Sequence, residues 1–473
     1  MRSHLRIGSF ALLAIGGLVV HLAGCEDSSE GTPIVTPGGG DAGFGSDGST
    51  DGSVGPGDGS TTDGGGDGGP SGPVVTSCAA AVRVDTLRGV NGATSMSAAG
   101  YGDKWTAVWL QNSTVSPDNQ FHFKGRAFDG AALLPEHDFG IDNFGNFSAA
   151  VADGTGHAFV QRYVGPAGDR FVYDYATNAW GVGTAFPVVN SGTDPMALAA
   201  IPTGGAISAY RDGTNVLADR WLPATSTWTT TGLAGLPAVV AGLRLFVNAT
   251  GKAAAVWYLA DGTGTTISVT TFDGATWAPT KTELLPVADG SLAGLEGAIY
   301  ANGDVRLMFA IGGASTLKTM KYSAAAGTFD APSPIGAAVN SSGSAMAVGI
   351  DAQDRLTLAW IDNGKLQVRR DVGAGLGAAQ DLGPSLGFRL DLDRTSSNVT
   401  LLSYDTPKLT IRGISGAGTT WTPAVETNVG LTANMTVRIM SSVVFDSKGK
   451  PTVVAMQDIA GAGGLALSYA KCN

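Results

Sequence analysis

The stretch Gly251–Leu285, GKAAAVWYLADGTGTTISVTTFDGATWAPTKTELL, contains three short apolar runs separated by polar turns. The runs cover Ala253–Leu259, Thr266–Phe272 and Trp277–Leu284, and a tight turn at Asp273–Thr276 separates the last two. Runs of this length whose ends carry Gly, Asp and Thr are typical of β-strands and too short for helices. The stretch therefore predicts a unit of antiparallel strands, and versions of it recur along most of the chain.

Eight such units can be aligned on their first apolar run, with successive starts roughly 43–53 residues apart, as in the blades of propellers. They begin near Lys104 (KWTAVW), His157 (HAFVQRY), Ala206 (AISAYR), Lys252 (KAAAVWY), Asp304 (DVRLMFA), Arg355 (RLTLAW), Asn398 (NVTLLSY) and Lys450 (KPTVVAM). Most units also begin the third run with an aromatic residue, whose flat ring would pack between blades: Trp180, Trp228, Trp277, Phe329 and Trp421. The prediction is an all-β fold, one β-propeller over residues 74–473 with eight four-stranded blades, or seven if one unit is misaligned.

The two ends of the repeat region predict a closed ring. The last unit has two runs, Thr452–Gln457 and Leu465–Ala470, while Ala79–Leu87 reads as a strand with no partner of its own. Pairing these ends in one blade would satisfy both edges. Cys78 precedes the first of these segments and Cys472 follows the last, so in an exported protein we expect them to form a disulfide, the alternative being two free thiols.

Residues 1–24 have the pattern of a signal peptide, with Arg2 and Arg6 followed by an apolar core over Ile7–Leu22. The core ends in Leu-Ala-Gly-Cys25, which resembles the lipobox of bacterial lipoproteins. That resemblance implies cleavage before Cys25, a lipid anchor on Cys25, and a place in the bacterial envelope, at the outer membrane or cell surface. An ordinary signal peptide with a chance cysteine is the alternative.

Residues 25–73 consist almost entirely of Gly, Asp, Ser, Thr and Pro, which predicts a disordered spacer. Glycine-aspartate β-roll repeats, which bind calcium, need a fixed nine-residue period that this segment lacks. The formal net charge is −11, and nine acids with no Lys or Arg lie between Glu26 and Asp67. The rest is nearly neutral and has no basic stripe, which argues against nucleic acid as a partner. We expect a monomer that meets the membrane through its lipid alone.

No catalytic constellation is evident. After the leader the only histidines are His122, His137 and His157, and none lies in an HExxH or His/Cys pattern. There is no G-x-S-x-G motif and no phosphate-binding Gly loop before a helix. The turn Phe272–Trp277 loosely resembles the Asp-box hairpin, S-x-D-x-G-x-x-W, without its leading Ser. Asp boxes are structural hairpins, so the resemblance implies no catalytic residue, and we predict neither catalytic residues nor a cofactor.

Two long polar loops of the first unit, Leu110–Gln120 and Pro135–Asn146, are expected on one face of the ring. Acids and amides there lie beside Phe139, Phe144 and Phe147, an arrangement that would suit a sugar, and the same oxygens could hold Ca²⁺. The alternative is a solvated loop whose phenylalanines are tucked into the blade. The candidate ligand-binding residues are Asp118, Gln120, Glu136, His137, Asp138, Asp142 and Asn143.

These features favour a lipid-anchored, non-catalytic propeller that binds an extracellular glycan or protein. A structural envelope scaffold that docks other subunits is a second hypothesis, for which a large exposed apolar patch would be evidence. A surface glycoside hydrolase or lyase is the third, and it would require a pair of carboxylates about 5–9 Å apart.

Overall fold

The structure is a computed structural model of the chain. It describes residues 75–473 with the exception of 88–89, 114–119, 143–149, 164–166, 188–195, 214, 236–240, 261–263, 286–291, 312–315, 338–345, 372–374, 394–397, 406–407, 415–417, 428, 430–440 and 460–463. The predicted signal peptide, Cys25 and the spacer up to residue 73 lie outside the described residues. Within the described part, no helix has the length and apolar character needed to cross a membrane.

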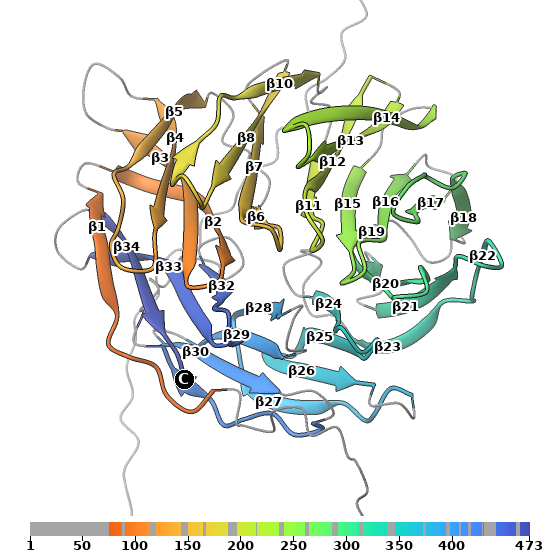
Figure 1. Ribbon diagram of the computed structural model, residues 1–473. Coiled ribbons are helices and arrows are strands. Elements are labelled where there is room, and N and C mark those ends of the chain that lie inside the picture. Colours follow the sequence, from red (N-terminus) through yellow and green to blue (C-terminus); the bar gives the residue numbers. More distant parts are fainter. Residues whose placement is uncertain are drawn as a thin grey trace, which may run out of the picture. The chain divides into compact units, whose positions relative to one another are not determined.

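The described part of the chain is a β-propeller of eight antiparallel blades arranged in a ring (Figure 1), which confirms the predicted fold class. Blade 1 contains β2 (Val90–Tyr101), β3 (Lys104–Ser113), β4 (Phe121–Phe128) and β5 (His137–Asp142). Blade 2 contains β6 (Val151–Ala152), β7 (His157–Tyr163), β8 (Ala167–Asp174), and a fourth strand in two pieces, β9 (Ala179–Trp180) and β10 (Thr184–Pro187). Blade 3 contains β11 (Met196–Ala200), β12 (Ala206–Asp212), β13 (Asn215–Leu222) and β14 (Thr227–Gly235). Blade 4 contains β15 (Ala241–Val247), β16 (Ala253–Ala260), β17 (Thr265–Phe272) and β18 (Lys281–Leu285).

The second half of the ring repeats the same order. Blade 5 contains β19 (Leu292–Ile299), β20 (Val305–Ile311), β21 (Thr316–Ser323), and the pieces β22 (Thr328–Phe329) and β23 (Ser333–Ala337). Blade 6 contains β24 (Met346–Ile350), β25 (Leu356–Asp362), β26 (Lys365–Arg370) and β27 (Gln380–Pro384). Blade 7 contains β28 (Gly387–Leu392), β29 (Val399–Asp405), β30 (Lys408–Ile414) and β31 (Val425–Glu426). Blade 8 contains β32 (Ser441–Phe445), β33 (Pro451–Ile459), β34 (Gly464–Lys471) and, outermost, β1 (Val82–Leu87).

The eight apolar runs that define the repeat in the sequence are the second strands of the blades, from β3 to β33. The innermost strands come before them, and each contacts the innermost strand of the next blade, from β2 through β6, β11, β15, β19, β24 and β28 to β32 and back to β2. Some of these strands are very short, such as β6 with two residues. Sequence periodicity therefore finds the second strand and misses the first.

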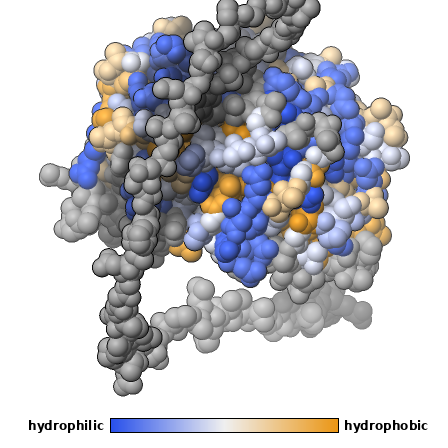
Figure 2. All heavy atoms as spheres, turned by 90° about the horizontal axis from the view of Figure 1, so that it is seen from below, coloured by the Kyte–Doolittle hydropathy of each residue, from blue (hydrophilic) through white to orange (hydrophobic). Residues whose placement is uncertain are grey.

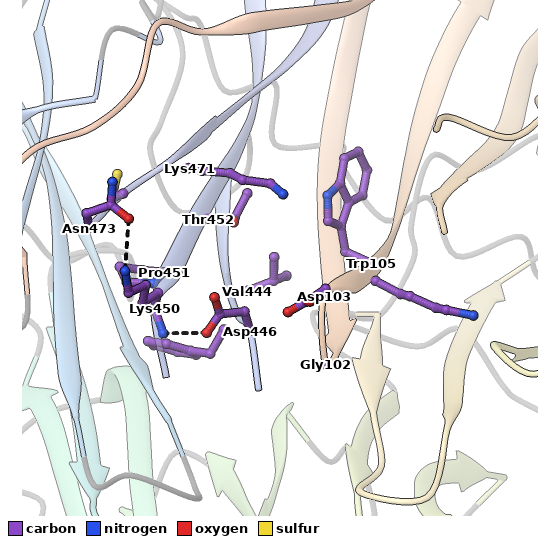
Figure 3. A pocket seen from close by; sticks show the side chains of 13 residues that line it. Gly102, Asp103, Trp105, Val444, Asp446, Lys450, Pro451, Thr452, Lys471 and Asn473 are labelled. Atoms are coloured by element: carbon purple, nitrogen blue, oxygen red, sulfur yellow. Dashed lines mark hydrogen bonds between the residues drawn. The ribbon is translucent and has the colours of Figure 1, made fainter. Parts of the chain in front are cut away.

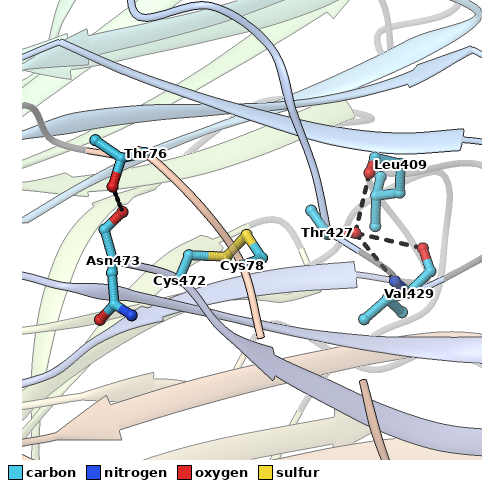
Figure 4. Close-up of a disulfide and its surroundings, with 7 residues drawn as sticks. All are labelled: Thr76, Cys78, Leu409, Thr427, Val429, Cys472 and Asn473. Atoms are coloured by element: carbon cyan, nitrogen blue, oxygen red, sulfur yellow. Dashed lines mark hydrogen bonds between the residues drawn. A yellow bond between two sulfur atoms is a disulfide. The ribbon is translucent and has the colours of Figure 1, made fainter. Parts of the chain in front are cut away.

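Blade 8 closes the ring by combining both ends of the described chain. β1 pairs with β34 in an antiparallel register that runs from Val82 opposite Tyr469 to Leu87 opposite Leu465. The predicted pairing of the two ends is thus confirmed. The C-terminal segment contributes three strands rather than two, because β32 forms the innermost strand ahead of the apolar run recognised in the sequence. The predicted disulfide between Cys78 and Cys472 is also present, next to a hydrogen bond from Thr76 Oγ1 to the carbonyl of Asn473 (2.9 Å; Figure 4).

Because neighbouring strands are antiparallel, the turns between strands 1 and 2 and between strands 3 and 4 emerge on one face of the ring, which we call the hairpin face. Four blades build their first turn in the same way. The side-chain oxygens of Asp153, Asn248, Asp351 and Asp446 accept hydrogen bonds from the backbone amides two and four residues later, at 2.8–3.0 Å. These Asx turns make the hairpin face a set of short, internally bonded loops.

Apolar side chains fill the gaps between neighbouring blades, and most gaps hold one continuous cluster. The aromatic residues that follow the turn after strand 3 take part as predicted: Trp180 packs with blade 1, Trp277 with blade 3 and Phe329 with blade 4. The gap between blades 2 and 3 differs, because its apolar contacts form two smaller clusters. Buried polar side chains, Gln161, Arg170, Ser208 and Asp219, lie in that same gap.

The disulfide is expected to stabilise the closed ring mainly by restricting the unfolded chain. Its cysteines are separated by 394 residues, for which the chain-entropy estimate is about 5–6 kcal/mol as an upper bound. The variant Cys78→Ser with Cys472→Ser should therefore unfold at a lower urea concentration than the parent protein. Reductant should lower the midpoint of the parent to that of the variant and leave the variant unchanged. Equal midpoints for parent and variant without reductant would contradict a stabilising role.

Candidate functional site

Several acidic candidates of the first unit lie in a charged strip between strands β4 and β5. Lys124 on β4 is directly opposite Asp138 on β5. Its Nζ lies 2.8 Å from Asp138 Oδ2 and 3.1 Å from Glu136 Oε1, and His122 Nδ1 lies 3.2 Å from the same Asp138 oxygen. Asp138 Oδ1 accepts the amide of Gly140 at 2.8 Å. The oxygens of Asp138 are thus already engaged within the blade.

The ionisation of this strip follows from its contacts. Burial would raise the pKa of Asp138, but hydrogen bonds from Lys124 and the Gly140 amide, and the charge of Lys124, outweigh it and hold the pKa below its ordinary value. Burial would likewise lower the pKa of Lys124, and its bonds to Asp138 and Glu136 raise it instead. Both groups therefore stay charged near neutral pH, as a partly exposed cross-strand ion pair.

The remaining candidates of the first unit are only partly described. Gln120 is exposed, immediately before β4. The prediction of a loop over Pro135–Asn146 is wrong for most of that segment, because His137–Asp142 form strand β5, paired with β4. The backbone of Asp142 ends β5 opposite Phe121, which begins β4 and pairs with Asn112 near the end of β3. The side chain of Asp142 and the residues Asp118, Asn143, Phe144 and Phe147 lie outside the described part of the structure. Within the described ranges, no group of three or more His, Cys, Asp or Glu side chains could hold a metal ion.

Phe139 is buried rather than exposed. Only 8% of its surface is accessible, because its ring packs between Phe123 of the same blade (4.9 Å between centroids) and Phe171 of blade 2 (4.6 Å). His137 remains half-buried at the edge of this cluster, where burial lowers the pKa of its imidazole. Its ring stacks on Trp180 of blade 2 at 6.0 Å. One first-unit candidate, His137, is thus in contact with an aromatic residue of the next blade, Trp180.

Trp180 opens onto a groove between blades 2 and 3 on the outer part of the hairpin face, which we call the aromatic groove. The groove encloses about 570 Å³, within the usual range for ligand sites. Its lining contains three indoles, one imidazole and several hydroxyl groups; the residues are His157, Val172, Asp174, Thr177, Ala179, Trp180, Gly181, Val182, Thr184, Trp221, Ser226, Thr227 and Trp228.

Local strand geometry places the three indoles along the groove. Trp180 and Trp228 are each the second residue of the strand that follows the turn after strand 3, and Trp228 pairs across the sheet with Trp221. Trp221 is almost fully buried, with its ring 5.0 Å from Phe159 and 4.9 Å from His157. Trp180 and Trp228 are partly exposed. The groove therefore has one buried indole in its floor and two that are open to solvent.

Each open indole is supported from behind. Trp180 packs edge-on against Phe139 at 4.8 Å and against Tyr173 at 4.9 Å. Trp228 rests on the guanidinium of Arg170, whose carbon lies 4.4 Å from the ring centre. Rings braced in this way keep their orientation without a ligand, which reduces the entropy lost on binding.

Arg170 is held in place by a buried polar network. Its Nη2 donates to Asp219 Oδ2 at 2.5 Å, the Tyr210 hydroxyl donates to Asp219 Oδ1 at 3.1 Å, and the guanidinium also stacks on Phe186 at 4.3 Å. Arg170 and Asp219 are only 2% and 3% exposed. Burial lowers the pKa of Arg170 and raises the pKa of Tyr210 to about 12. The buried Arg170–Asp219 ion pair lies in the gap where the apolar contacts between blades 2 and 3 form two separate clusters.

One carboxylate lies in the groove. Burial would raise the pKa of Asp174, but hydrogen bonds from the Ala176 amide (2.8 Å) and the Thr177 hydroxyl (2.9 Å) outweigh it, so the net shift is downward and the group is ionised at neutral pH. Among the described residues that line the groove, Asp174 is the only acid. A glycosidase site needs two carboxyl groups, one of them protonated. Indole faces, hydroxyls and a single carboxylate are suited to binding a sugar ring.

This groove was not predicted from the sequence, although its three tryptophans were recognised there individually. Trp180 and Trp228 were expected between blades and Trp221 in the core, and each lies there. The available signal was that blades 2 and 3 are consecutive and together carry three tryptophans near their third turns.

No family model and no curated protein matches this chain. Solved structures with a similar fold include the polysaccharide lyase Uly1, at 10% identity and a TM-score of 0.46, covering 83% of this chain and all of that one. The Dos1 propeller is 8% identical with a TM-score of 0.49, covering 82% and 94% of the two chains. The SapL1 lectin in complex with alpha methyl fucoside is 11% identical with a TM-score of 0.35, covering 69% and 96%. Similarity at this level extends to the propeller fold alone.

Removing one member of the Arg170–Asp219 pair should be strongly destabilising, because it leaves the other charge buried without compensation. We expect Arg170→Met and Asp219→Leu each to lower the free energy of unfolding by about 3–5 kcal/mol. The double variant should lose less than the sum of the two, since no lone charge remains. Urea unfolding of the four proteins measures this, and purely additive losses would show that the two residues are not coupled.

Proposed function

We propose that the protein is a lipid-anchored, non-catalytic binding module whose aromatic groove takes an extracellular glycan. The observation that carries the proposal is the convergence of Trp180, Trp221 and Trp228, from two blades, on one groove of about 570 Å³. Sugar rings present apolar faces that stack on indoles and hydroxyls that hydrogen-bond to polar side chains. The exposed Thr177, Ser226 and Thr227 and the ionised Asp174 supply such partners at the groove edge.

The proposal includes the anchor predicted from the Leu-Ala-Gly-Cys25 ending of the leader. A lipid on Cys25 and the Gly- and Asp-rich spacer up to residue 73 would hold the propeller at a distance from the outer membrane, where a monomer could reach glycans of the envelope or of the surroundings. Each buried methylene contributes about 0.8 kcal/mol, so two or more acyl chains suffice for stable attachment.

The surface gives less support to a scaffold that docks other subunits. Figure 2 shows one side of the molecule, where hydrophilic residues separate small apolar areas. In the described part of the chain, the exposed large apolar side chains belong to separate places in the fold: Val82, Tyr101, Ile141, Val182, Leu284 and Leu386. Scattered residues of this kind are normal on a monomer.

Removing an open indole should weaken glycan binding. The full-length protein would be screened on a glycan array with and without Ca²⁺, and the best ligand titrated by calorimetry. Because an aromatic contact contributes about 0.5–1.5 kcal/mol, Trp180→Ala and Trp228→Ala should each weaken binding about 2- to 10-fold. Trp277→Ala is the matched control, since Trp277 occupies the same position in blade 4, packs on Phe272 and lies outside the groove.

Other outcomes of that experiment point elsewhere. Unchanged binding in both groove variants, with loss in Asp138→Ala plus Asp142→Ala, would move the site to the first-unit loops. A requirement for Ca²⁺ would indicate a metal held by those loops. Release of cleaved sugar from the array would show a hydrolase or lyase and overturn the non-catalytic role.

Replacing Cys25 by Ser should release the protein from the membrane. In a bacterial host that processes lipoproteins, the parent chain should incorporate radiolabelled palmitate and sediment with membranes. Cys25→Ser should do neither, because the thiol that accepts the lipid is missing. Labelling of both proteins would contradict the assignment of the anchor to Cys25.

A further inference from the structure

A second and separate pocket lies on the hairpin face, at the seam where blade 8 meets blade 1. It encloses about 70 Å³, more than the roughly 30 Å³ that one water occupies in the liquid. The space admits a molecule of a few heavy atoms and is too small for a sugar ring. Its walls are the first turns of both blades and the end of β34, with the residues Gly102, Asp103, Lys104, Trp105, Val444, Phe445, Asp446, Lys450, Pro451, Thr452, Lys471, Cys472 and Asn473 (Figure 3).

Trp105 departs from the repeat at this seam. In blade 1, Trp105 on the second strand pairs with Gly100 on the innermost strand, at the end of these strands next to the first turn. The other blades place aliphatic residues or proline there, namely Ala158, Ala206, Ala253, Val305, Leu356, Val399 and Pro451. Apolar packing at this position thus does not require an indole, and only the indole brings a hydrogen-bond donor.

That donor is buried and unsatisfied. Trp105 is 2% exposed, and no acceptor among the described residues lies within hydrogen-bond distance of its Nε1. The ring is fixed by Phe128 at 5.7 Å and Tyr469 at 5.5 Å, and its nitrogen edge faces into the pocket in Figure 3. A buried donor without a partner is unfavourable, and an acceptor in the pocket would satisfy it.

A cation lies on the same side of the pocket as the indole nitrogen. Two of the three lysines are bound by the fold: Lys104 Nζ donates to the Tyr175 carbonyl at 2.7 Å and Lys450 Nζ to Asn473 Oδ1 at 3.2 Å. The side chain of Lys471 extends toward Trp105 in Figure 3, with its Nζ 5.3 Å from the centre of the Phe128 ring.

The opposite side of the pocket is acidic. Asp103 and Asp446 lie on this side of the pocket in Figure 3, one from each blade. Asp446 Oδ1 accepts the amides of Lys448 and Lys450, both at 2.8 Å, which fixes the carboxylate, and Asp103 Oδ1 lies 3.5 Å from Ser447 Oγ. The pocket thus has a donor side and an acceptor side.

We infer that the seam pocket binds a small zwitterion, an α-amino acid of the size of glycine or alanine. The carboxylate accepts hydrogen bonds from Trp105 Nε1 and Lys471 Nζ, and the ammonium group donates to Asp103 and Asp446. A ligand with a carboxylate and no ammonium group would bring its negative charge close to Asp103 and Asp446 without neutralising them. A ligand with an ammonium group and no carboxylate would leave the Trp105 N–H without an acceptor. The two poles together therefore select the zwitterion over either half.

The test uses the indole N–H signals of the full chain in a nitrogen–proton correlation spectrum. The signal of Trp105 is the one lost in Trp105→Phe, and glycine, acetate and methylammonium are titrated separately against it. Glycine should shift this signal at concentrations at least 5-fold lower than acetate, and methylammonium should leave it in place. Equal responses to glycine, acetate and sodium chloride, or no response to glycine, would overturn the proposal.

Trp360→Phe is the matched control. Trp360 is also 2% exposed with an unpartnered Nε1 within the described part, but it lies outside the seam pocket. Calorimetry should show glycine binding weakened at least 5-fold by Trp105→Phe and by Lys471→Met, and unchanged by Trp360→Phe. Both Phe variants keep an aromatic ring, and thermal unfolding shows whether each remains folded. Equal affinity in Trp105→Phe and the parent would also overturn the site.

Discussion

The structure depends on the closure of a ring of eight inner strands. Each blade buries its faces only against its two neighbours, so an open chain of blades would leave two apolar faces exposed to water. The pairing of β1 with β34 removes that exposure by placing both ends of the described chain in blade 8. The Cys78–Cys472 bridge makes the closure covalent. Every gap between blades, and therefore every pocket between blades, is defined once this contact forms.

The gaps between blades are not equivalent, and the difference accounts for the aromatic groove. Between blades 6 and 7 the apolar core is continuous and Trp421 is buried in it. Between blades 2 and 3 the core is divided by Arg170 and Asp219. A buried ion pair contributes little net stability compared with well-packed apolar groups. Its effect here is geometric, because the guanidinium supports Trp228 from behind and leaves the other side of the ring open.

Much of the fold could be predicted from the sequence because its signals are local. The recurring apolar runs located all eight second strands. The run Ala79–Leu87, which had no partner of its own, and the cysteines Cys78 and Cys472 indicated how the ring closes. Innermost strands such as β6 and β32 were harder to find, since they are short and gain their stability from contacts with neighbouring blades.

The sites could be predicted less well, because they depend on register and on contacts between blades. Nothing near Asp138 in the sequence says that Lys124 lies opposite it, and that pairing changes an apparently free acid into half of an ion pair. Trp180, Trp221 and Trp228 were each assigned correctly as packing residues. Their convergence could not be read from any one repeat, because two blades contribute to the groove.

Both pockets occur where the repeat departs from its own pattern. A propeller assembled from similar units has a default residue at each position, and a costly departure from it calls for a physical reason. Trp105 stands where seven blades have aliphatic residues or proline, and its N–H is buried without a partner in the described structure. Arg170 and Asp219 stand in a gap of the kind that other blades fill with apolar side chains. Each exception is unfavourable for packing alone, and each supports a surface hollow on the hairpin face, where the short Asx turns hold the surrounding backbone in place.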